Sequence, residues 1–152
     1  MYNLHNIENN TNIMKRFFIY GFIGCSMEVF WTGISSLFKG DAALMAHSSI
    51  WMIIIYGMAI LLEPIQNILK NKNWFFRGLV YMLLIYVGEY VTGFALDVLN
   101  IKVWKYTDTL NINGYVTLTF APLWFLAGLF FERVRLWLDN VSEIDTELSY
   151  DS

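Results

Sequence analysis

The sequence has little charge, one cysteine and two histidines, and each of these shortages argues against a class of protein. Charged residues make up 15% of the 152 residues and hydrophobic residues 57%, which is too apolar for an ordinary soluble domain. A single cysteine, Cys25, excludes an internal disulfide and a cysteine-based metal site. His5 and His47 lie far apart in the sequence, so we expect no metal. A net charge of -3 without a basic patch argues against nucleic-acid binding.

The chain also lacks a glycine-rich phosphate-binding loop. We therefore expect no bound nucleotide and no other cofactor. If the protein works with ATP, a separate ATPase subunit must hydrolyse it. The absence of a nucleotide-binding or metal motif argues against an enzyme, but the sequence leaves this question open.

The sequence instead contains four long apolar runs, which cover residues 17–38, 50–69, 79–99 and 120–138. Each run approaches the roughly 20 residues with which a helix crosses about 30 Å of hydrocarbon. None of them alternates apolar and polar residues as the strands of a membrane barrel do. We expect an all-α fold: a polytopic membrane protein with a four-helix transmembrane bundle.

This bundle is expected to occupy residues 14–138, between a polar N-terminal tail, 1–13, and an acidic C-terminal tail, 139–152. Seven of the ten basic residues fall on the side of the membrane that holds both ends of the chain. By the positive-inside rule, the N- and C-termini are then cytoplasmic and the protein is a multi-pass protein of the cell membrane.

Each apolar run carries one glutamate, and these are Glu28, Glu63, Glu89 and Glu132. A carboxylate inside a membrane-spanning helix costs several kcal/mol unless it is protonated, paired or facing water. Glu28 and Glu89 fall roughly 15 to 20 Å from the cytoplasmic ends of their helices, near the bilayer midplane. Their helix faces are small and polar, so we expect a substrate or proton site there, with the alternative that protonated carboxyls bond between helices. The accompanying candidates are Thr32, Thr92, Tyr86 and Asp97.

Glu63 and Glu132 lie in the cytoplasmic half of their runs, where basic residues are near. The candidate partners of these two carboxylates in structural ion pairs are Arg77, Arg133 and Arg135. A functional role for Glu63 and Glu132 stays open as the alternative.

The connection over residues 100–119 is too polar for hydrocarbon, and Asn113-Gly114 within it predicts a tight turn. This connection can fold back over the outer mouth of the bundle, which makes candidates of Trp104, Tyr106, Asp108 and Asn113. The alternative is a plain interfacial loop with aromatic anchors.

The first and third runs also resemble each other. Glu28-Val-Phe-Trp-Thr32-Gly33 is similar to Glu89-Tyr-Val-Thr92-Gly93, which suggests a tandem repeat of two-helix hairpins. The four glutamates would then surround a pseudo-twofold axis.

Five motifs follow one another along the chain: Tyr20-Gly21-x-x-Gly24-x-x-x-Glu28, Ile55-Tyr56-Gly57, Glu89-Tyr90-x-Thr92-Gly93, Trp104-x-Tyr106 and Asn113-Gly114. Over residues 14–135 this ordered set resembles the membrane protein family called putative ABC-transporter type IV, or CmpB-like. It also shows likeness to the small animal transmembrane protein 229 group. Where many members have Trp-Asp-Tyr, this chain has Trp104-Lys105-Tyr106, and Cys25 stands where many have tryptophan.

The resemblance implies a permease-like, transport-related subunit. With four helices the pathway would be thin, so we expect a homodimer or a partner membrane or ATPase subunit in addition to the lipid bilayer. The glycines Gly21, Gly24, Gly33, Gly57, Gly93 and Gly128 offer positions for close approach. Two alternatives remain: an intramembrane enzyme acting on a lipid or isoprenoid-linked substrate, and an assembly factor for another membrane protein.

Overall fold

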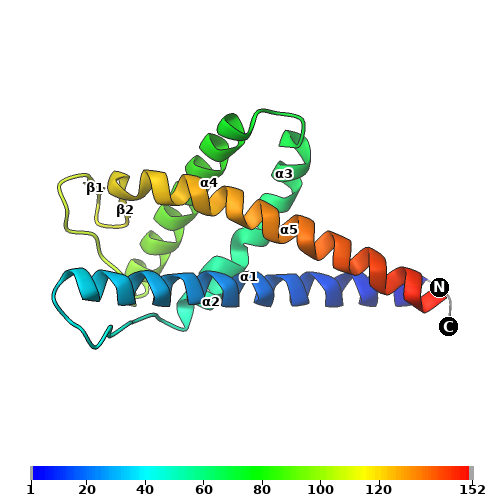
Figure 1. The fold of residues 1–152 in the computed structure, drawn as a ribbon, viewed down its shortest axis with the longest axis horizontal. Coiled ribbons are helices and arrows are strands. Elements are labelled where there is room, and N and C mark those ends of the chain that lie inside the picture. Colours follow the sequence, from blue (N-terminus) through cyan, green and yellow to red (C-terminus); the bar gives the residue numbers. More distant parts are fainter. Residues whose placement is uncertain (1, 151–152) are drawn as a thin grey trace. The chain divides into compact units, whose positions relative to one another are not determined.

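A computed structural model describes the backbone of residues 2–150 and the side chains of residues 12–142. Its elements are, in order, α1 (Tyr2–Phe38), α2 (Trp51–Gly57), the 3₁₀ turn η1 (Met58–Leu62), α3 (Glu63–Leu69), α4 (Trp74–Val98), β1 (Asn111–Ile112), β2 (Val116–Thr117), the 3₁₀ turn η2 (Leu118–Phe120) and α5 (Ala121–Tyr150) (Figure 1). The two strands are short and pair antiparallel. The expected all-α fold is confirmed.

Within the described residues, three helical segments are long and apolar enough to cross a membrane: Asn12–Phe38, Trp51–Leu69 and Trp74–Val98. The second of these combines α2, η1 and α3. The fourth helix, α5, is not among them, because Glu132, Arg133 and Arg135 interrupt its apolar stretch. The expectation of a polytopic membrane protein is confirmed, while a membrane crossing by α5 stays a prediction.

Both terminal helices extend beyond the boundaries expected from hydropathy. α1 begins at Tyr2 and α5 ends at Tyr150, so helix continues into the segments that the sequence sets apart as tails, 1–13 and 139–152. The apolar run marks where a helix can enter hydrocarbon, whereas the backbone hydrogen bonds of a helix do not depend on hydropathy.

The chain divides into two compact units, Met1–Leu61 and Leu62–Ser152. In the first unit α1 packs against α2. The contact is close at Gly21, where a Cβ atom would lie 2.3 Å from the carbonyl oxygen of Ile53. Any side chain larger than hydrogen at this position would therefore force the two backbones apart.

In the second unit α4 packs against α5. The side chain of Asn73 caps α4 by accepting a hydrogen bond from the N–H of Phe75, which fixes where the helix begins. Gly78 then makes room for the ring of Phe125, which also meets Trp74 and Phe75 edge-on or tilted, with ring centroids 5.6 to 5.9 Å apart. These contacts place the face of α4 that bears Glu89 relative to α5.

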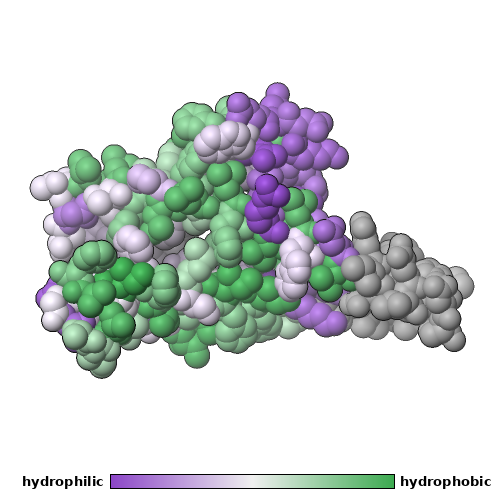
Figure 2. All heavy atoms as spheres, in the orientation of Figure 1, coloured by the Kyte–Doolittle hydropathy of each residue, from purple (hydrophilic) through white to green (hydrophobic). Residues whose placement is uncertain are grey.

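Large apolar side chains lie on the outer surfaces of the helices. Phe18, Phe22 and Phe30 of α1 are 46%, 57% and 70% exposed, on the face that the sequence predicts to be opposite Glu28. On α4, the exposed side chains Val87, Val91 and Val98 follow helical spacing. Figure 2 shows that hydrophobic residues cover most of the helical surface on the face drawn. Such surfaces suit hydrocarbon as the solvent.

Candidate functional site

The polar side chains of α4 lie at intervals of three and four residues, as the sequence predicts. Tyr86, Glu89 and Thr92 therefore share one face of the helix, and Gly93 leaves space beside them. The hydroxyl of Thr92 donates to the carbonyl oxygen of Gly88, at 2.8 Å, and so bonds to its own helix. Tyr86 and Glu89, in contrast, form hydrogen bonds with segments beyond α4.

Glu89 accepts hydrogen bonds from two other segments of the second unit. The hydroxyl of Tyr106 donates to Oε1 at 2.6 Å, and the indole N–H of Trp124 donates to Oε2 at 3.1 Å. Tyr106 belongs to the connection after α4, and Trp124 to the first turns of α5. One carboxylate thus joins α4, α5 and the connection between them.

The charge of the Glu89 carboxylate is not balanced by a basic side chain among the described residues. Among the side chains of residues 12–142, no lysine or arginine forms an ion pair with Glu89. Its two donors are neutral, so they orient the group without supplying a positive charge. Since an unpaired charge inside a membrane-spanning helix is costly, the role of this carboxylate as a cation or proton site stays a prediction.

We call residues 100–119 the outer segment, after the side of the membrane on which the sequence predicts them, and this segment lies back along α4 (Figure 1). Hydrogen bonds attach it at three further places. Tyr86 donates to the carbonyl oxygen of Thr117 at 3.1 Å, Tyr115 donates to Oδ2 of Asp97 at 2.7 Å, and the amide of Asn113 donates to the hydroxyl of Tyr90 at 2.9 Å. The expected fold-back of this connection is therefore seen for the helix that carries Glu89.

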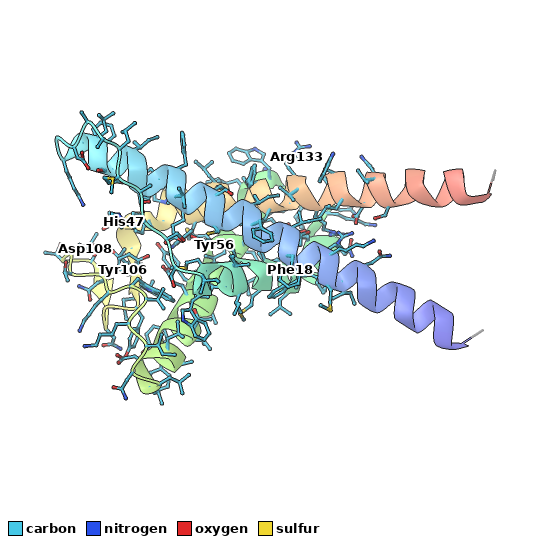
Figure 3. All side chains as sticks on the ribbon, turned by 90° about the horizontal axis from the view of Figure 1, so that it is seen from below. Phe18, His47, Tyr56, Tyr106, Asp108 and Arg133 are labelled. Carbon is cyan, nitrogen blue, oxygen red and sulfur yellow. The ribbon has the colours of Figure 1, made fainter. Side chains whose placement is uncertain are left out.

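Asp108 organises the outer segment internally. Its Oδ2 accepts hydrogen bonds from the hydroxyls of Thr117 and Thr119, at 2.5 and 2.7 Å, and these bonds hold the pKa of Asp108 below its usual range. Asn113 and Gly114 both have positive φ, 54° and 78°, as the tight turn predicted there requires. Figure 3 shows Tyr106 and Asp108 on this segment.

The side chains of Trp104 and Asp97 form their hydrogen bonds with residues other than Glu89. The indole N–H of Trp104 donates to the carbonyl oxygen of Tyr115, at 3.0 Å, within the outer segment. Asp97 lies on the last turn of α4, eight residues or about 12 Å beyond Glu89. The hydrogen bond and the charge of Asp97 raise the pKa of Tyr115.

In the first unit, Glu28 is bonded in a related way. The hydroxyl of Ser48, in the connection after α1, donates to its Oε2 at 3.1 Å, and Cys25 Sγ lies 3.4 Å from the Ser48 oxygen. Thr32 bonds to the carbonyl oxygen of Glu28, at 3.0 Å, and accepts from the backbone N–H of His47 at 3.1 Å. Each unit thus has a helix glutamate that accepts a hydrogen bond from a hydroxyl of the following connection.

The two glutamates do not share contacts that the structure describes. Glu28 belongs to the first unit and Glu89 to the second. The expected midplane pair therefore stays a prediction, and each carboxylate is considered within its own unit.

Of the two glutamates predicted to form structural ion pairs, Glu132 lies beside an arginine, whereas an ion pair of the Glu63 carboxylate stays a prediction. Glu132 is buried and lies 3.5 Å from Nη1 of Arg77, so it joins the first turn of α4 to α5. Arg135 donates to the carbonyl oxygen of Glu63 at 3.1 Å and to the side chain of Asn67. Arg133 is exposed on α5 (Figure 3).

Sequence reasoning missed Trp124 and Ser48. By its position near the start of an apolar run, Trp124 is typical of an interfacial anchor, although an indole N–H that is buried must find an acceptor. The sequence does not show that Glu89 is the acceptor, because Glu89 and Trp124 are 35 residues apart in the chain. Ser48 lies in the connection between α1 and α2, and no sequence pattern there indicates which group its hydroxyl bonds to.

No metal site is formed within the described side chains, since none of their histidines, cysteines and acids gather in groups of three or more that could hold an ion. In comparisons with known proteins, the family model described as "Putative ABC-transporter type IV" matches residues 16–149. No solved structure matches the chain.

Proposed function

Since the chain belongs to the family of putative ABC-transporter type IV proteins, we propose that it is a transport-related membrane subunit in which Glu89 binds the transported proton or the cation coupled to it. In this proposal the outer segment covers the carboxylate on its outer side. The family supports the transport class, and the geometry around Glu89 supports the site.

The observation that carries the proposal is the pair of neutral hydrogen bonds to Glu89. Trp124 belongs to a helix and Tyr106 to the outer segment, and we propose that the Tyr106 hydroxyl is the donor that leaves. When the outer segment lifts, Oε1 loses the Tyr106 hydroxyl and can accept a proton or cation, while Trp124 keeps Oε2 in place. Return of Tyr106 then favours release of that ion, because its hydroxyl competes for the same oxygen.

Coupling to ATP would require a partner, because the sequence has no phosphate-binding loop. The connection between α3 and α4 carries Lys70 and Lys72, both exposed, and is the surface that we assign to such a subunit. A second copy of the chain is the other candidate partner.

The test is proton flux into vesicles that contain the purified protein and an entrapped pH-sensitive dye, driven by a potassium diffusion potential. Wild-type protein should acidify the vesicles faster than protein-free vesicles do. Glu89→Gln keeps the shape of the side chain and one oxygen that can accept from the Trp124 indole, while its amide can donate to the Tyr106 hydroxyl. The substitution removes the charge, and the rate should fall to that of empty vesicles.

Glu132→Gln is the matched control, since it removes a carboxylate that is paired with Arg77. It should lower stability and leave the flux of folded protein unchanged. The proposal is wrong if folded Glu89→Gln transports like wild type, or if wild-type vesicles acidify no faster than empty ones.

A further inference from the structure

A second site lies at the outer end of α4, where a pocket of about 130 Å³ opens between the last turn of the helix and the outer segment. A cavity of about 150 Å³ holds a molecule of the size of benzene, so the pocket can take a small polar group. Glu89 does not line it. The polar and aromatic side chains that do are Asp97, Lys102, Trp104, Lys105, Asn113 and Tyr115.

The two lysines give this pocket an unbalanced positive side. Within residues 12–142, neither Lys102 nor Lys105 forms an ion pair with an acidic side chain. The methylene chain of Lys105 lies over Gly114, since its Cγ and Cε are 3.1 and 3.2 Å from where a Cβ of Gly114 would be. Two ammonium groups on one pocket are a suitable partner for a phosphate.

The pocket also has an acidic side chain, which can bind a cation. Asp97 lines it, and α4 ends one residue later, at Val98. The carbonyl groups at a helix C-terminus carry partial negative charge, which adds to that of the carboxylate. A primary amine can donate to the Asp97 carboxylate, which also accepts from Tyr115, whereas a quaternary amine has no hydrogen to donate.

Apolar surface adjoins the pocket. Phe94, Val98 and Leu99 are 53%, 65% and 64% exposed on the same end of α4. This end of a membrane-spanning helix meets the level of lipid headgroups. A ligand with one charged end and hydrocarbon chains would contact both surfaces at once.

We propose that this pocket binds the headgroup of a phospholipid that carries a primary amine, with the phosphate at Lys102 and Lys105, the amine at Asp97, and the acyl chains along the exposed apolar residues. The site is separate from the Glu89 carboxylate and does not depend on the function proposed for it. Such a lipid would hold the outer segment against α4 from the outer leaflet.

The experiment is native mass spectrometry of the full-length protein in detergent, titrated with phosphatidylethanolamine, phosphatidylglycerol, phosphatidylcholine and free phosphoethanolamine. Phosphatidylethanolamine should bind most tightly, because phosphatidylglycerol lacks the amine and phosphatidylcholine lacks its hydrogens. Lys102→Gln with Lys105→Gln should weaken that binding about tenfold or more, since each charge-assisted hydrogen bond is worth about 1.5 kcal/mol or more. Asp97→Asn should remove the preference for phosphatidylethanolamine over phosphatidylglycerol.

The matched control is Lys15→Gln with Lys39→Gln, which removes two exposed lysines of the first unit and should leave lipid binding unchanged. Equal affinity for all three lipids, or unchanged binding by the Lys102 and Lys105 variant, overturns the proposal. Free phosphoethanolamine that binds as tightly as the lipid also overturns it, in favour of a site for a soluble phosphate. If the double variant does not fold, the order of the lipids on wild-type protein still decides the question.

Discussion

At the scale of single residues, the glutamates of the apolar helices differ in the charge of the side chains that bond to them. Glu132 has a cation, Arg77, at 3.5 Å, whereas the hydrogen-bond donors to Glu89 are a phenol and an indole, both neutral. A buried ion pair is a structural contact, because removing either member leaves the other uncompensated. A carboxylate with neutral donors can exchange a proton or cation without that loss. The difference in function that we infer for these glutamates follows from their donors.

Tyr106→Phe should destabilise the protein by about 1.5 to 3 kcal/mol, the usual cost of removing a hydrogen bond to a charged group. The matched control is Tyr90→Phe, since the Tyr90 hydroxyl meets the neutral amide of Asn113 and should contribute about 1 kcal/mol or less. Chemical unfolding in detergent, followed by tryptophan fluorescence, measures both. Equal effects of the two substitutions would contradict the importance given to the Tyr106 bond.

Asp108 predicts a dependence of stability on pH. Its pKa in the folded protein lies below the ordinary value of 3.8, because the hydroxyls of Thr117 and Thr119 bond to the charged form. The stabilisation is therefore present above 3.8 and is lost as the pH falls through the folded pKa. The melting temperature of wild type should drop more than that of Asp108→Asn when the pH is lowered from about 6 to about 3. Parallel curves for the two proteins would exclude this role.

At the scale of elements, the glycines expected to serve an interface between subunits are used within the units. Gly24 lies against the ring of Tyr56 in the first unit, and Gly128 lies against Tyr81 in the second. The sequence shows where small residues permit close approach, but it does not show which helix approaches. Each hairpin of helices supplies its own partner, so these glycines are evidence for packing inside the chain.

Gly21→Ala should destabilise the first unit by about 1 to 3 kcal/mol, since the added methyl would meet the Ile53 carbonyl oxygen, which belongs to backbone and cannot turn aside. Gly88→Ala is the matched control, because a Cβ there has nothing within 4 Å and alanine favours helix. It should be neutral or stabilising. Thermal unfolding of the two variants compares them, and a neutral Gly21→Ala would show that α1 and α2 can separate at little cost.

At the scale of the whole molecule, the sequence predicted the class of fold and the three helices that are long and apolar enough to span a membrane, because hydropathy over about 20 residues is a strong signal. Its ordered motifs also predicted the family. It also predicted the turn at Asn113 and the ion pairing of Glu132. It did not predict Trp124 at Glu89, since contacts between distant segments depend on helix rotation and on the path of the outer segment. Cytoplasmic termini, a repeat of hairpins and the pairing of Glu28 with Glu89 stay predictions.

The central claim is that Glu89 works beneath an outer segment that opens, and a disulfide between that segment and α4 tests it most directly. A Cβ at Gly93 would lie 3.1 Å from Cβ of Tyr115, so cysteines at these two positions need a shift of only a few tenths of an ångström to reach the 3.5 to 4.5 Å of a disulfide. Cys25→Ser removes the native thiol, and each single cysteine variant serves as a control.

The measurement is proton flux by this double-cysteine protein in dye-loaded vesicles, before and after reduction. The account predicts that the oxidised protein transports no faster than empty vesicles and that reduction restores the flux. Equal flux in the two states, with the disulfide verified by mass, would contradict it.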